Sequence, residues 1–351
     1  MRTATAVALG LTVGPAFAGE SVMWGEERPN GATRFVLDLP DREPLLVHRI
    51  APPTARDTER GFRSTPGSFA ASADRFAAVV VTSTWFQEDF DSASVAVTSA
   101  AVSGRFTAPV EVVSGAVPAR GDESCAGGRP AYQYVDAVAL DGERLAVGQF
   151  EDECTEDNGP WTDTVKVYDG GAVTTVHSGE QGMIRDVALA GRFVAWVRDA
   201  EEDELVVHDV EAGAAVLRLT QDDLAARGLD ELALQDDGTV AFLFSNRNFQ
   251  RLAWAAPGTP GARTLARGEF RGLALDGGRV LYERVRRFTG ELLLRSLGGG
   301  PPRRLASFSQ RRRRVGDLDL AGTRAAWATH PTKRGYDPPA TGPARVVVRD
   351  L

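Results

Sequence analysis

The sequence predicts an all-β fold, a β-propeller of four-stranded antiparallel blades, and three observations support this prediction. First, a ten-residue phrase recurs seven times, and in each copy two apolar runs flank a Gly or Asp turn. Second, the copies are spaced by about 40 to about 70 residues, and one propeller blade takes about 40–45. Third, runs that alternate between apolar and polar residues follow the copies, as in antiparallel strands. The clearest copies are VALAGRFVAW (Val187 to Trp196), LALDGGRVLY (Leu273 to Tyr282) and LDLAGTRAAW (Leu318 to Trp327).

Each copy of the phrase predicts the first two strands of one blade and the turn between them. The turn positions are Gly19, Asp74, Gly142, Gly191, Asp237, Gly277 and Gly322. Five residues later stands an aromatic residue or valine, at Trp24, Val79, Val147, Trp196, Phe242, Tyr282 and Trp327. Large rings and β-branched side chains suit a pleated strand that packs against the next blade. We therefore expect this column to be core rather than a stack of rings that binds a ligand.

The third and fourth strands of each blade follow the phrase. Third strands are expected at Arg34–Asp38, Ser94–Thr98, Thr164–Tyr168, Glu204–His208, Gln250–Trp254, Glu291–Arg295 and Ala344–Arg349. Fourth strands are expected at Pro44–Ile50, Val110–Val113, Ala172–His177, Ala214–Leu219, Thr264–Ala266 and Arg303–Ala306. Between two blades, Thr220 opens a short stretch, Gln221–Arg227, that has the pattern of a turn of helix.

The last repeat ends at Leu351 on its third strand, so its fourth strand has to come from elsewhere in the chain. A ring protects its edges when a strand from the opposite terminus completes the final blade. The apolar stretch Thr3–Leu9 is the candidate for this closing strand. We expect a single propeller domain over residues 1–351 with seven blades. The alternative is a six-bladed ring that Pro44–Ile50 closes after removal of the N-terminus.

Residues 1–18 also have the features of an export signal, which conflicts with a place in the ring. Met1 to Ala18 contains one Arg, an apolar stretch and the small-residue site Ala16-Phe17-Ala18. Yet Pro15–Trp24 matches the repeated phrase, so cleavage after Ala18 would remove the first strand of the first blade. Export predicts an extracellular, periplasmic or cell-envelope location, with a signal upstream of Met1 as one way to keep the fold. A structural role for residues 1–18 predicts a cytoplasmic location instead.

Composition and charge limit the class of partner. The chain has 351 residues, a net charge of -8 and 43% hydrophobic residues, which is typical of a globular protein. The excess of acidic residues argues against a nucleic-acid binder, whose affinity depends on neutralising phosphates. No apolar stretch reaches the ~20 residues of a membrane-spanning helix. We expect a monomer with no membrane span and no nucleic-acid partner.

The two cysteines flank the third copy of the phrase. Cys125 precedes its first strand and Cys154 follows its second, so antiparallel pairing would bring both toward the same end of the hairpin. We expect a disulfide between them, which requires an oxidising compartment. Two free thiols are the alternative.

Motifs of common catalytic sites are missing from the sequence. It contains no G-x-S-x-G nucleophile elbow and no H-E-x-x-H zinc motif. The histidines are scattered over four repeats, where we expect satisfied strand residues rather than ligands. They are His48, His177, His208 and His330. We therefore assign no catalytic and no cofactor-binding residue from the sequence.

Two acidic runs fall in equivalent loops of neighbouring blades. The first, Glu151–Asn158, offers the oxygen ligands that Ca²⁺ prefers. Its candidate ligands are Asp152, Glu153, Glu156 and Asp157. The run lacks EF-hand spacing, so a solvated acidic loop is the alternative. With the second run, Asp199–Glu204, it would give one face of the ring a negative field that favours a basic partner or a cation.

The chain has one basic run, Arg311–Arg314. Arg284, Arg286 and Arg287 lie in a loop of the preceding blade. These arginines suit either an anion site or a solvated connection between blades.

The insertion Thr84–Ser94 is a candidate contact loop. It contains Trp85, Phe86 and Phe90, and exposed aromatic residues on a rigid loop are common contact anchors. Alternatively, the insertion folds back over the ring as a cap.

The repeats resemble those of the TolB and PD40-like propellers, part of the broader WD40-like group. The matching segments are DGERLAV followed by TVKVYDGG, AGRFVAW followed by ELVVHDVEAGAAVLRLT, and GGRVLY followed by ELLLRSLGGGPPRRL. The resemblance covers most of the chain from about residue 15. It implies an extracytoplasmic propeller, often an interaction scaffold, and no particular partner.

Together these observations predict a non-catalytic, exported propeller scaffold that binds a protein or cell-envelope partner through its loops. No cofactor is expected apart from Ca²⁺ at the first acidic run. The alternative is a propeller hydrolase or lyase that uses acidic residues at the mouth of the central channel, because propellers host enzymes as well as binding modules. Acidic side chains at that mouth would favour the enzyme, and small apolar ones would disfavour it.

Overall fold

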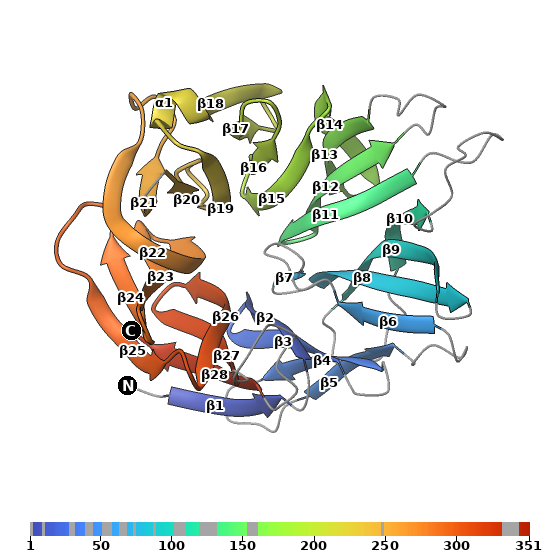
Figure 1. The fold of residues 1–351 in the computed structure, drawn as a ribbon, viewed down its shortest axis with the longest axis horizontal. Helices are drawn as coiled ribbons and strands as arrows, with labels where there is room; N and C mark the ends of the chain where they lie inside the picture. Colours follow the sequence, from blue (N-terminus) through green and yellow to red (C-terminus); the bar gives the residue numbers. More distant parts are fainter. Residues whose placement is uncertain are drawn as a thin grey trace.

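The computed structural model describes residues 3–8, 11–27, 32–38, 45–50, 58–62, 69–72, 75–86, 89–101, 110–118, 132–152, 161–246, 249–331 and 344–351. In these ranges the regular elements are β-strands and one short helix, which confirms the all-β prediction. The sheets stand side by side around a central axis, and the N-terminal strands lie next to the C-terminal ones (Figure 1). The fold is a β-propeller of antiparallel sheets, as the repeats predict.

Three sheets of four strands follow the chain in order. They consist of β2 (Leu11–Ala18), β3 (Ser21–Glu27), β4 (Thr33–Asp38) and β5 (Leu45–Ile50); of β11 (Tyr132–Asp141), β12 (Arg144–Asp152), β13 (Trp161–Asp169) and β14 (Ala172–Glu180); and of β15 (Met183–Ala190), β16 (Phe193–Asp199), β17 (Glu204–Asp209) and β18 (Ala214–Thr220). Each strand pairs with the one before it, so the repeated phrase forms the first hairpin of each sheet, as predicted.

A larger sheet joins two such units. It contains β19 (Gly228–Leu234), β20 (Val240–Ser245), β21 (Gln250–Ala255), β22 (Arg263–Asp276), β23 (Arg279–Arg286), β24 (Thr289–Ser296) and β25 (Arg303–Ser309). The first half of β22 pairs with β21 and the second half with β23, so β22 is the last strand of one unit and the first strand of the next. If this sheet is divided at β22, the described strands form seven blades, the number expected from the repeats. The blade count depends on that division.

The second blade departs from the prediction at its inner edge. β8 (Arg75–Phe86) pairs with β9 (Asp89–Ala101), and β9 pairs with β10 (Val110–Pro118). The other side of β8 is shared by two short strands, β6 (Thr58–Phe62) and β7 (Phe69–Ala71). β6 was not predicted, because its residues TERGF show no alternation of apolar and polar side chains. The expected turn at Asp74 lies outside the described residues.

A strand from the N-terminus completes the last blade. β1 (Thr3–Ala8) pairs with β28 (Ala344–Asp350), with Thr3 opposite Arg349. β28 pairs in turn with β27 (Arg324–Pro331), and β27 with β26 (Arg313–Ala321). The predicted closure by Thr3–Leu9 is confirmed. Closure by Pro44–Ile50 is wrong, because β5 pairs with β4.

The helix α1 (Gln221–Leu224) lies where a turn of helix was predicted. Thr220 caps it, because its hydroxyl accepts the Asp223 N–H at 3.3 Å while the Asp223 carboxylate accepts the Thr220 N–H at 3.0 Å. The helix ends at Leu224, before the predicted Arg227, because Ala225 adopts a left-handed conformation. No helix in the described part of the chain is long and apolar enough to cross a membrane.

The aromatic column is buried between the blades. Its seven side chains have relative exposures of 5% or less, and they are Trp24, Val79, Val147, Trp196, Phe242, Tyr282 and Trp327. Trp196, for example, packs in a cluster that joins the sheets β11–β14 and β15–β18. Full burial of a large apolar side chain stabilises a fold by about 1.5–3 kcal/mol. The expected role as core is confirmed.

At two places in the ring the repeated turn links one blade to the next. Gly191 has a φ of 53°, a left-handed conformation that favours glycine. Its N–H donates to Asp141 Oδ2 of the preceding blade at 2.6 Å, and its carbonyl accepts a hydrogen bond from Arg144. The same contacts recur at Asp276, Arg279 and Gly322. The D-G-x-R turn is therefore a polar clasp between neighbouring blades.

Candidate functional site

The first strands of the blades surround a central channel. A cavity of about 250 Å³ lies among β2, β7, β11, β15, β19, β22 and β26. Much of its lining is small or aliphatic, such as Ala139, Ala188 and Leu275. Four carboxyl side chains also line it: Asp186 from β15, Glu231 from β19, and Asp317 and Asp319 from β26. The channel therefore contains both kinds of side chain that the sequence analysis contrasted, acidic and small apolar.

β-Bulges lie next to these acidic residues. β15 shifts register between Ile184 and Asp186, and β19 shifts between Leu229 and Glu231. The irregular stretch in β26 includes Asp317. A bulge adds an unpaired residue and re-aims the side chains around it, and bulges are frequent beside functional sites. The same local device thus accompanies the acidic residue on three different strands.

Asp186 and Glu231 bond to the backbone of the following blade. The Leu232 N–H donates to Asp186 Oδ2 at 2.9 Å, and the Val187 N–H donates to Asp186 Oδ1 at 2.9 Å. Glu231 accepts a backbone hydrogen bond from Gly272 in β22. These carboxyl groups therefore hold neighbouring first strands together at the wall of the cavity.

Asp317 and Asp319 make the equivalent connection between the last blade and the first. The Gly14 N–H donates to Asp317 Oδ2 at 2.6 Å, and the Phe17 N–H donates to Asp319 Oδ2 at 2.5 Å. Both donors belong to β2. The ring is thus closed by these carboxyl groups at its centre as well as by β1 in its last blade.

The channel raises the pKa of its carboxyl groups. Burial raises the pKa of Asp186 to about 7, because hydrogen bonds from Leu232 and Val187 offset only part of the lost hydration. Burial also raises the pKa of Glu231, to about 8, and the charges of Asp186, Asp317 and Asp230 add to the effect. Glu231 therefore carries a proton at neutral pH, whereas Asp186 is protonated mainly below about pH 7.

Asp317 and Asp319 are shifted less. Burial raises the pKa of each to about 6, against a backbone hydrogen bond to Asp317 and two to Asp319. Chemically, such carboxyl groups can donate hydrogen bonds or protons near neutral pH. In the part of the chain that the structure describes, no cluster of His, Cys, Asp or Glu has the arrangement of a metal site.

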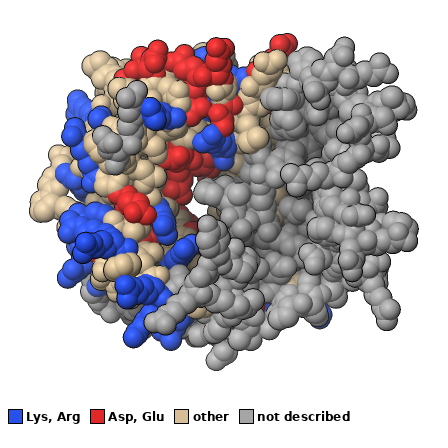
Figure 2. Space-filling model, viewed as in Figure 1, with Lys and Arg blue, Asp and Glu red and all other residues tan. Residues whose placement is uncertain are grey.

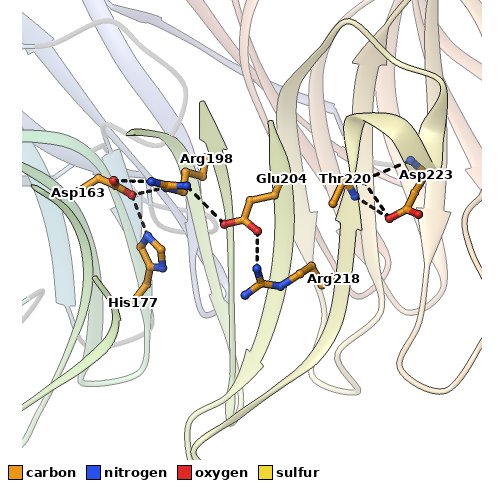
Figure 3. A network of polar contacts seen from close by, with 7 residues as sticks. All are labelled: Asp163, His177, Arg198, Glu204, Arg218, Thr220 and Asp223. Carbon is orange, nitrogen blue, oxygen red and sulfur yellow. Dashed lines mark hydrogen bonds and ion pairs between the residues drawn. The ribbon is translucent and has the colours of Figure 1, made fainter. Parts of the chain in front are cut away.

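A second polar group lies between the sheets β11–β14 and β15–β18, and none of its members lines the cavity. Asp163 in β13 is fully buried, and its Oδ2 lies 2.7 Å from Arg198 Nε and 2.8 Å from His177 Nε2 (Figure 3). Arg198 Nη2 also donates to Asp163 Oδ1 at 3.0 Å, which makes the pair bidentate. Glu204 extends the group, 3.9 Å from Arg198 and 2.8 Å from Arg218.

This network lowers the pKa of its buried carboxyl group. Burial alone would raise the pKa of Asp163, but the hydrogen bonds and charges of His177 and Arg198 lower it to about 2. The guanidinium also requires glycine beside it, because a Cβ on Gly182 would lie 2.6 Å from Arg198 Nε. The network is therefore a permanently charged link between two blades.

The histidines do not converge on the channel. His177 in β14, His208 in β17 and His330 in β27 are outside the cavity lining. His177 is bonded to Asp163, as expected for a satisfied strand residue. Burial lowers the pKa of His208 and of His330. The side chain of His48 lies outside the described residues.

The two predicted acidic runs have different outcomes. Asp152 ends β12, but its side chain and the residues Glu153, Glu156 and Asp157 lie outside the described part, so the Ca²⁺ site stays a prediction. The run Asp199–Glu204 joins β16 to β17, as expected.

The second run is partly neutralised within the fold. Asp199 pairs with Arg185, and Asp203 is buried and accepts the Leu229 N–H at 3.2 Å. Glu201 and Glu202 remain exposed. Glu201 and Glu202 are therefore the charged side chains of this loop that are accessible to a partner.

The candidate contact loop is an extension of a hairpin. Trp85 and Phe86 end β8, Phe90 lies near the start of β9, and Trp85 is opposite Phe90 in the register. The side chains of all three lie outside the described residues, so the contact role stays a prediction. Their backbone places them in paired strands rather than in an irregular loop.

The predicted disulfide also stays a prediction, because Cys125 and Cys154 lie outside the described residues. The strands that they flank do pair as the prediction requires. β11 and β12 are antiparallel, with Tyr132 opposite Asp152 at the end nearest both cysteines.

The channel carboxyl groups were not predicted from the sequence, although the repeats contain a signal for two of them. Asp186 and Asp317 each stand five residues before a turn glycine, Gly191 and Gly322. The same position in the other five repeats holds Gly14, Phe69, Ala137, Leu232 and Gly272, which are all uncharged. An acidic residue at this position therefore distinguishes two repeats from the others. Glu231 escapes this comparison because the turn after β19 is longer.

Comparison with solved structures agrees with the fold. A prolyl endopeptidase matches at 12% identity with a TM-score of 0.56, over 93% of this chain and 45% of the endopeptidase. The propeller domain of the Trilobed protease from Pyrococcus furiosus matches at 10% identity and 0.51, over 80% of each chain. The polysaccharide lyase Uly1 matches at 8% identity and 0.51, over 95% of this chain and 88% of the lyase.

These likenesses show the fold alone. This chain spans about half the length of several peptidases that it matches, and its propeller is similar to the propeller domains of such enzymes. The Pyrococcus furiosus domain is described as having an open velcro topology, whereas here β1 pairs with β28. No protein-family model matches the sequence. No curated protein matches it closely enough to count as a relative.

Proposed function

We propose that this protein is a non-catalytic propeller scaffold that binds a protein or cell-envelope partner through the loops of one face. The observation that carries this proposal is the division of charge around the ring. Acidic side chains gather over the sector of β18 and α1, and basic ones over the sectors that follow it (Figure 2). Two regions of opposite sign on one rigid body orient a partner and exclude wrong ones.

The charged loops share one end of the blades. Exposed Glu201 and Glu202 lie between a second and a third strand, and exposed Asp222 and Asp223 lie in the connection after a fourth strand. In an antiparallel blade these two kinds of loop come at the same end. Arg286–Phe288 and Arg311–Arg312 occupy the same two positions two blades further on. The acidic and the basic loops therefore lie on the same face of the ring.

The resemblance to TolB and PD40-like repeats supports an interaction scaffold outside the cytoplasm. We propose an extracellular, periplasmic or cell-envelope location, in line with the predicted Cys125–Cys154 bond. Because Thr3–Ala8 and Leu11–Ala18 form β1 and β2, cleavage after Ala18 would remove both strands. Mass spectrometry of the mature chain from its host tests the cleavage site and the disulfide together.

Crosslinking in the native host tests the proposed function. The wild-type chain is compared with E201K/E202K, with R311E/R312E and with the control R263E/R267E, whose exposed arginines lie on the outer part of β22. We expect one captured partner to be lost on charge reversal in the acidic or the basic sector and retained in the control. Capture that is equal for all four chains would contradict the proposal.

The channel supports a second candidate function, a hydrolase or lyase. Asp186 and Glu231 line a cavity and have pKa values near neutrality, as general acids do. The fold is also that of a polysaccharide lyase. An assay of glycosides and acidic polysaccharides tests this candidate: turnover that D186N abolishes while the fold persists would favour the enzyme.

A further inference from the structure

We propose that the partner contributes an extended acidic peptide segment, which adds as a strand to the outer edge of β25 and is anchored at the arginine turn. The arginine turn is the surface made by Arg286, Arg287, Phe288, Arg311 and Arg312. This inference rests on the proposed binding function and names the chemical class of the partner.

Two loops meet to form the arginine turn. One connects β23 to β24 and carries Phe288, and the other connects β25 to β26 and carries Arg311. The Gln310 N–H donates to the Phe288 carbonyl at 2.7 Å, which ties the loops together. The Arg311 guanidinium lies 4.0 Å from the centre of the Phe288 ring. The charge and the ring are thus held in one fixed arrangement.

Buried residues support this surface from below. Glu283 is fully buried, and its Oε1 accepts a hydrogen bond from the Gln310 side chain. Gly290 makes the close packing there possible, because a Cβ at this position would lie 2.3 Å from Phe308. The surface is therefore presented by an ordered base, which lowers the entropy cost of binding.

An aromatic anchor is exposed on the surface. Phe288 is 53% exposed, and large apolar side chains with such exposure are few in the described residues. A shallow surface hollow that is open to solvent lies between Phe288, Ser307, Phe308 and Arg311. Exposed rings next to hollows are typical anchors of protein interfaces. A simple anion site would not require one.

The edge of β25 is open. β25 is the last strand of its sheet, and in the described part of the chain no strand pairs with its outer side. Ser307 and Ser309 on this strand are exposed. An extended peptide adds to such an edge through main-chain hydrogen bonds, and neighbouring pockets select its side chains. Arginines also keep open edges from aggregating, but that role does not explain the exposed ring or the hollow beside it.

The charge of the surface selects an acidic segment. Arg284, Arg286 and Arg304 surround Glu291 and share its charge. By contrast, none of the ion pairs among the described residues includes Arg287, Arg311 or Arg312. Carboxylates on every second residue of an added strand would supply the missing counter-charges, because alternate side chains share one face.

Fluorescence anisotropy tests the proposal with a labelled peptide of about ten residues that alternates Glu with Val and has a central Phe. We expect saturable binding that R311E/R312E weakens about tenfold or more and that about 0.5 M NaCl suppresses. The control variant R263E/R267E should bind like the wild type. Methylation of alternate peptide nitrogens, which leaves the charge intact but removes main-chain donors, should abolish binding.

Four outcomes would overturn the proposal. Equal binding to R311E/R312E places the peptide elsewhere, and equal binding of the methylated peptide shows contact by charge without strand addition. Stronger binding of dextran sulfate than of the peptide, with the same dependence on Arg311 and Arg312, assigns the surface to an anionic polymer. If the peptide fails while a crosslinked partner still depends on Glu201 and Glu202, this inference falls and the proposed function stands. If the peptide binds but no partner is captured, the proposed function falls, and only the affinity of the arginine turn for an acidic strand stands.

Discussion

In the channel, Asp186 is buried against backbone N–H groups and its pKa rises to about 7; between two blades, Asp163 is buried against Arg198 and His177 and its pKa falls to about 2. Both side chains are buried aspartates on neighbouring sheets of one ring. Neutral hydrogen bonds do not replace the hydration of a carboxylate, whereas a bidentate guanidinium does. Burial alone therefore does not decide the charge of an acid, and the partner does.

The largest expected effect comes from removing the cation of the charged pair. R198M removes the bidentate guanidinium and leaves buried Asp163 with His177 as its remaining partner, so we expect a loss of about 3–5 kcal/mol in the free energy of unfolding. The measurement is urea unfolding at neutral pH. The matched control is R218M, whose side chain is 59% exposed at the open end of the same network, with an expected loss of at most about 1 kcal/mol. Equal losses for the two variants would show that the buried pair is not special.

The pH dependence of stability separates the two acids by sign. An unfolded aspartate ionises near pH 4 and folded Asp186 near pH 7, so the folded chain binds the extra proton between these values. Stability from this group therefore falls as the pH rises from about 4 to about 7 and stays low above that. For Asp163 the window is from about pH 4 down to about pH 2, and stability is lost as the pH falls through it.

The variant D186N isolates the channel contribution. Asn stays uncharged but has one acceptor oxygen where Asp186 uses two, so we expect the variant to be less stable than the wild type by about 1 kcal/mol near pH 4 and more stable by about 3 kcal/mol near pH 8. Unfolding curves at both pH values test this. A variant that is less stable than the wild type by the same amount at both pH values would show that Asp186 acts only through its hydrogen bonds.

The hydrogen bond between neighbouring turns extends the comparison to a carboxylate at the protein surface, where water can hydrate its charge. D276A removes the acceptor of the Gly322 N–H at 2.7 Å, and we expect a loss of about 1 kcal/mol. The control is D236A, on an exposed turn residue, with a change within about 0.5 kcal/mol. Thermal unfolding of both variants provides the measurement. A clasp loss as large as that of R198M would mean that surface and buried carboxylates are equivalent here.

The smallest effect on stability is expected at the arginine turn. R311E/R312E changes exposed side chains that belong to no ion pair of the described residues, so stability should stay within about 0.5 kcal/mol. Differential scanning fluorimetry beside the binding assay checks this. A large loss of stability would show that Arg311 and Arg312 stabilise the fold, as Arg198 is expected to do.

Much of the fold was predictable because the repeat is local. Strand and turn patterns repeat at the spacing of a blade, and the open last repeat pointed to β1. Departures also have local causes: β6 lacks alternation, and in the fifth turn the residue with the left-handed conformation is Gly238, with a φ of 81°, one position after Asp237. Little of the candidate site was predictable. Asp186, Glu231 and Asp317 come from different repeats, and each looks like an ordinary strand residue.

By itself the sequence determined the ring, its buried aromatic column and the N-terminal strand that closes it, because these depend on periodicity and on residues close together in the chain. The tertiary structure alone decided which acids meet in the channel, that Asp163 pairs with Arg198, and that Phe288 and Arg311 share one surface. Charges and pKa values depend on neighbours that are far apart in the chain. A pattern along one strand therefore does not reveal them, and the packing of one blade against the next does.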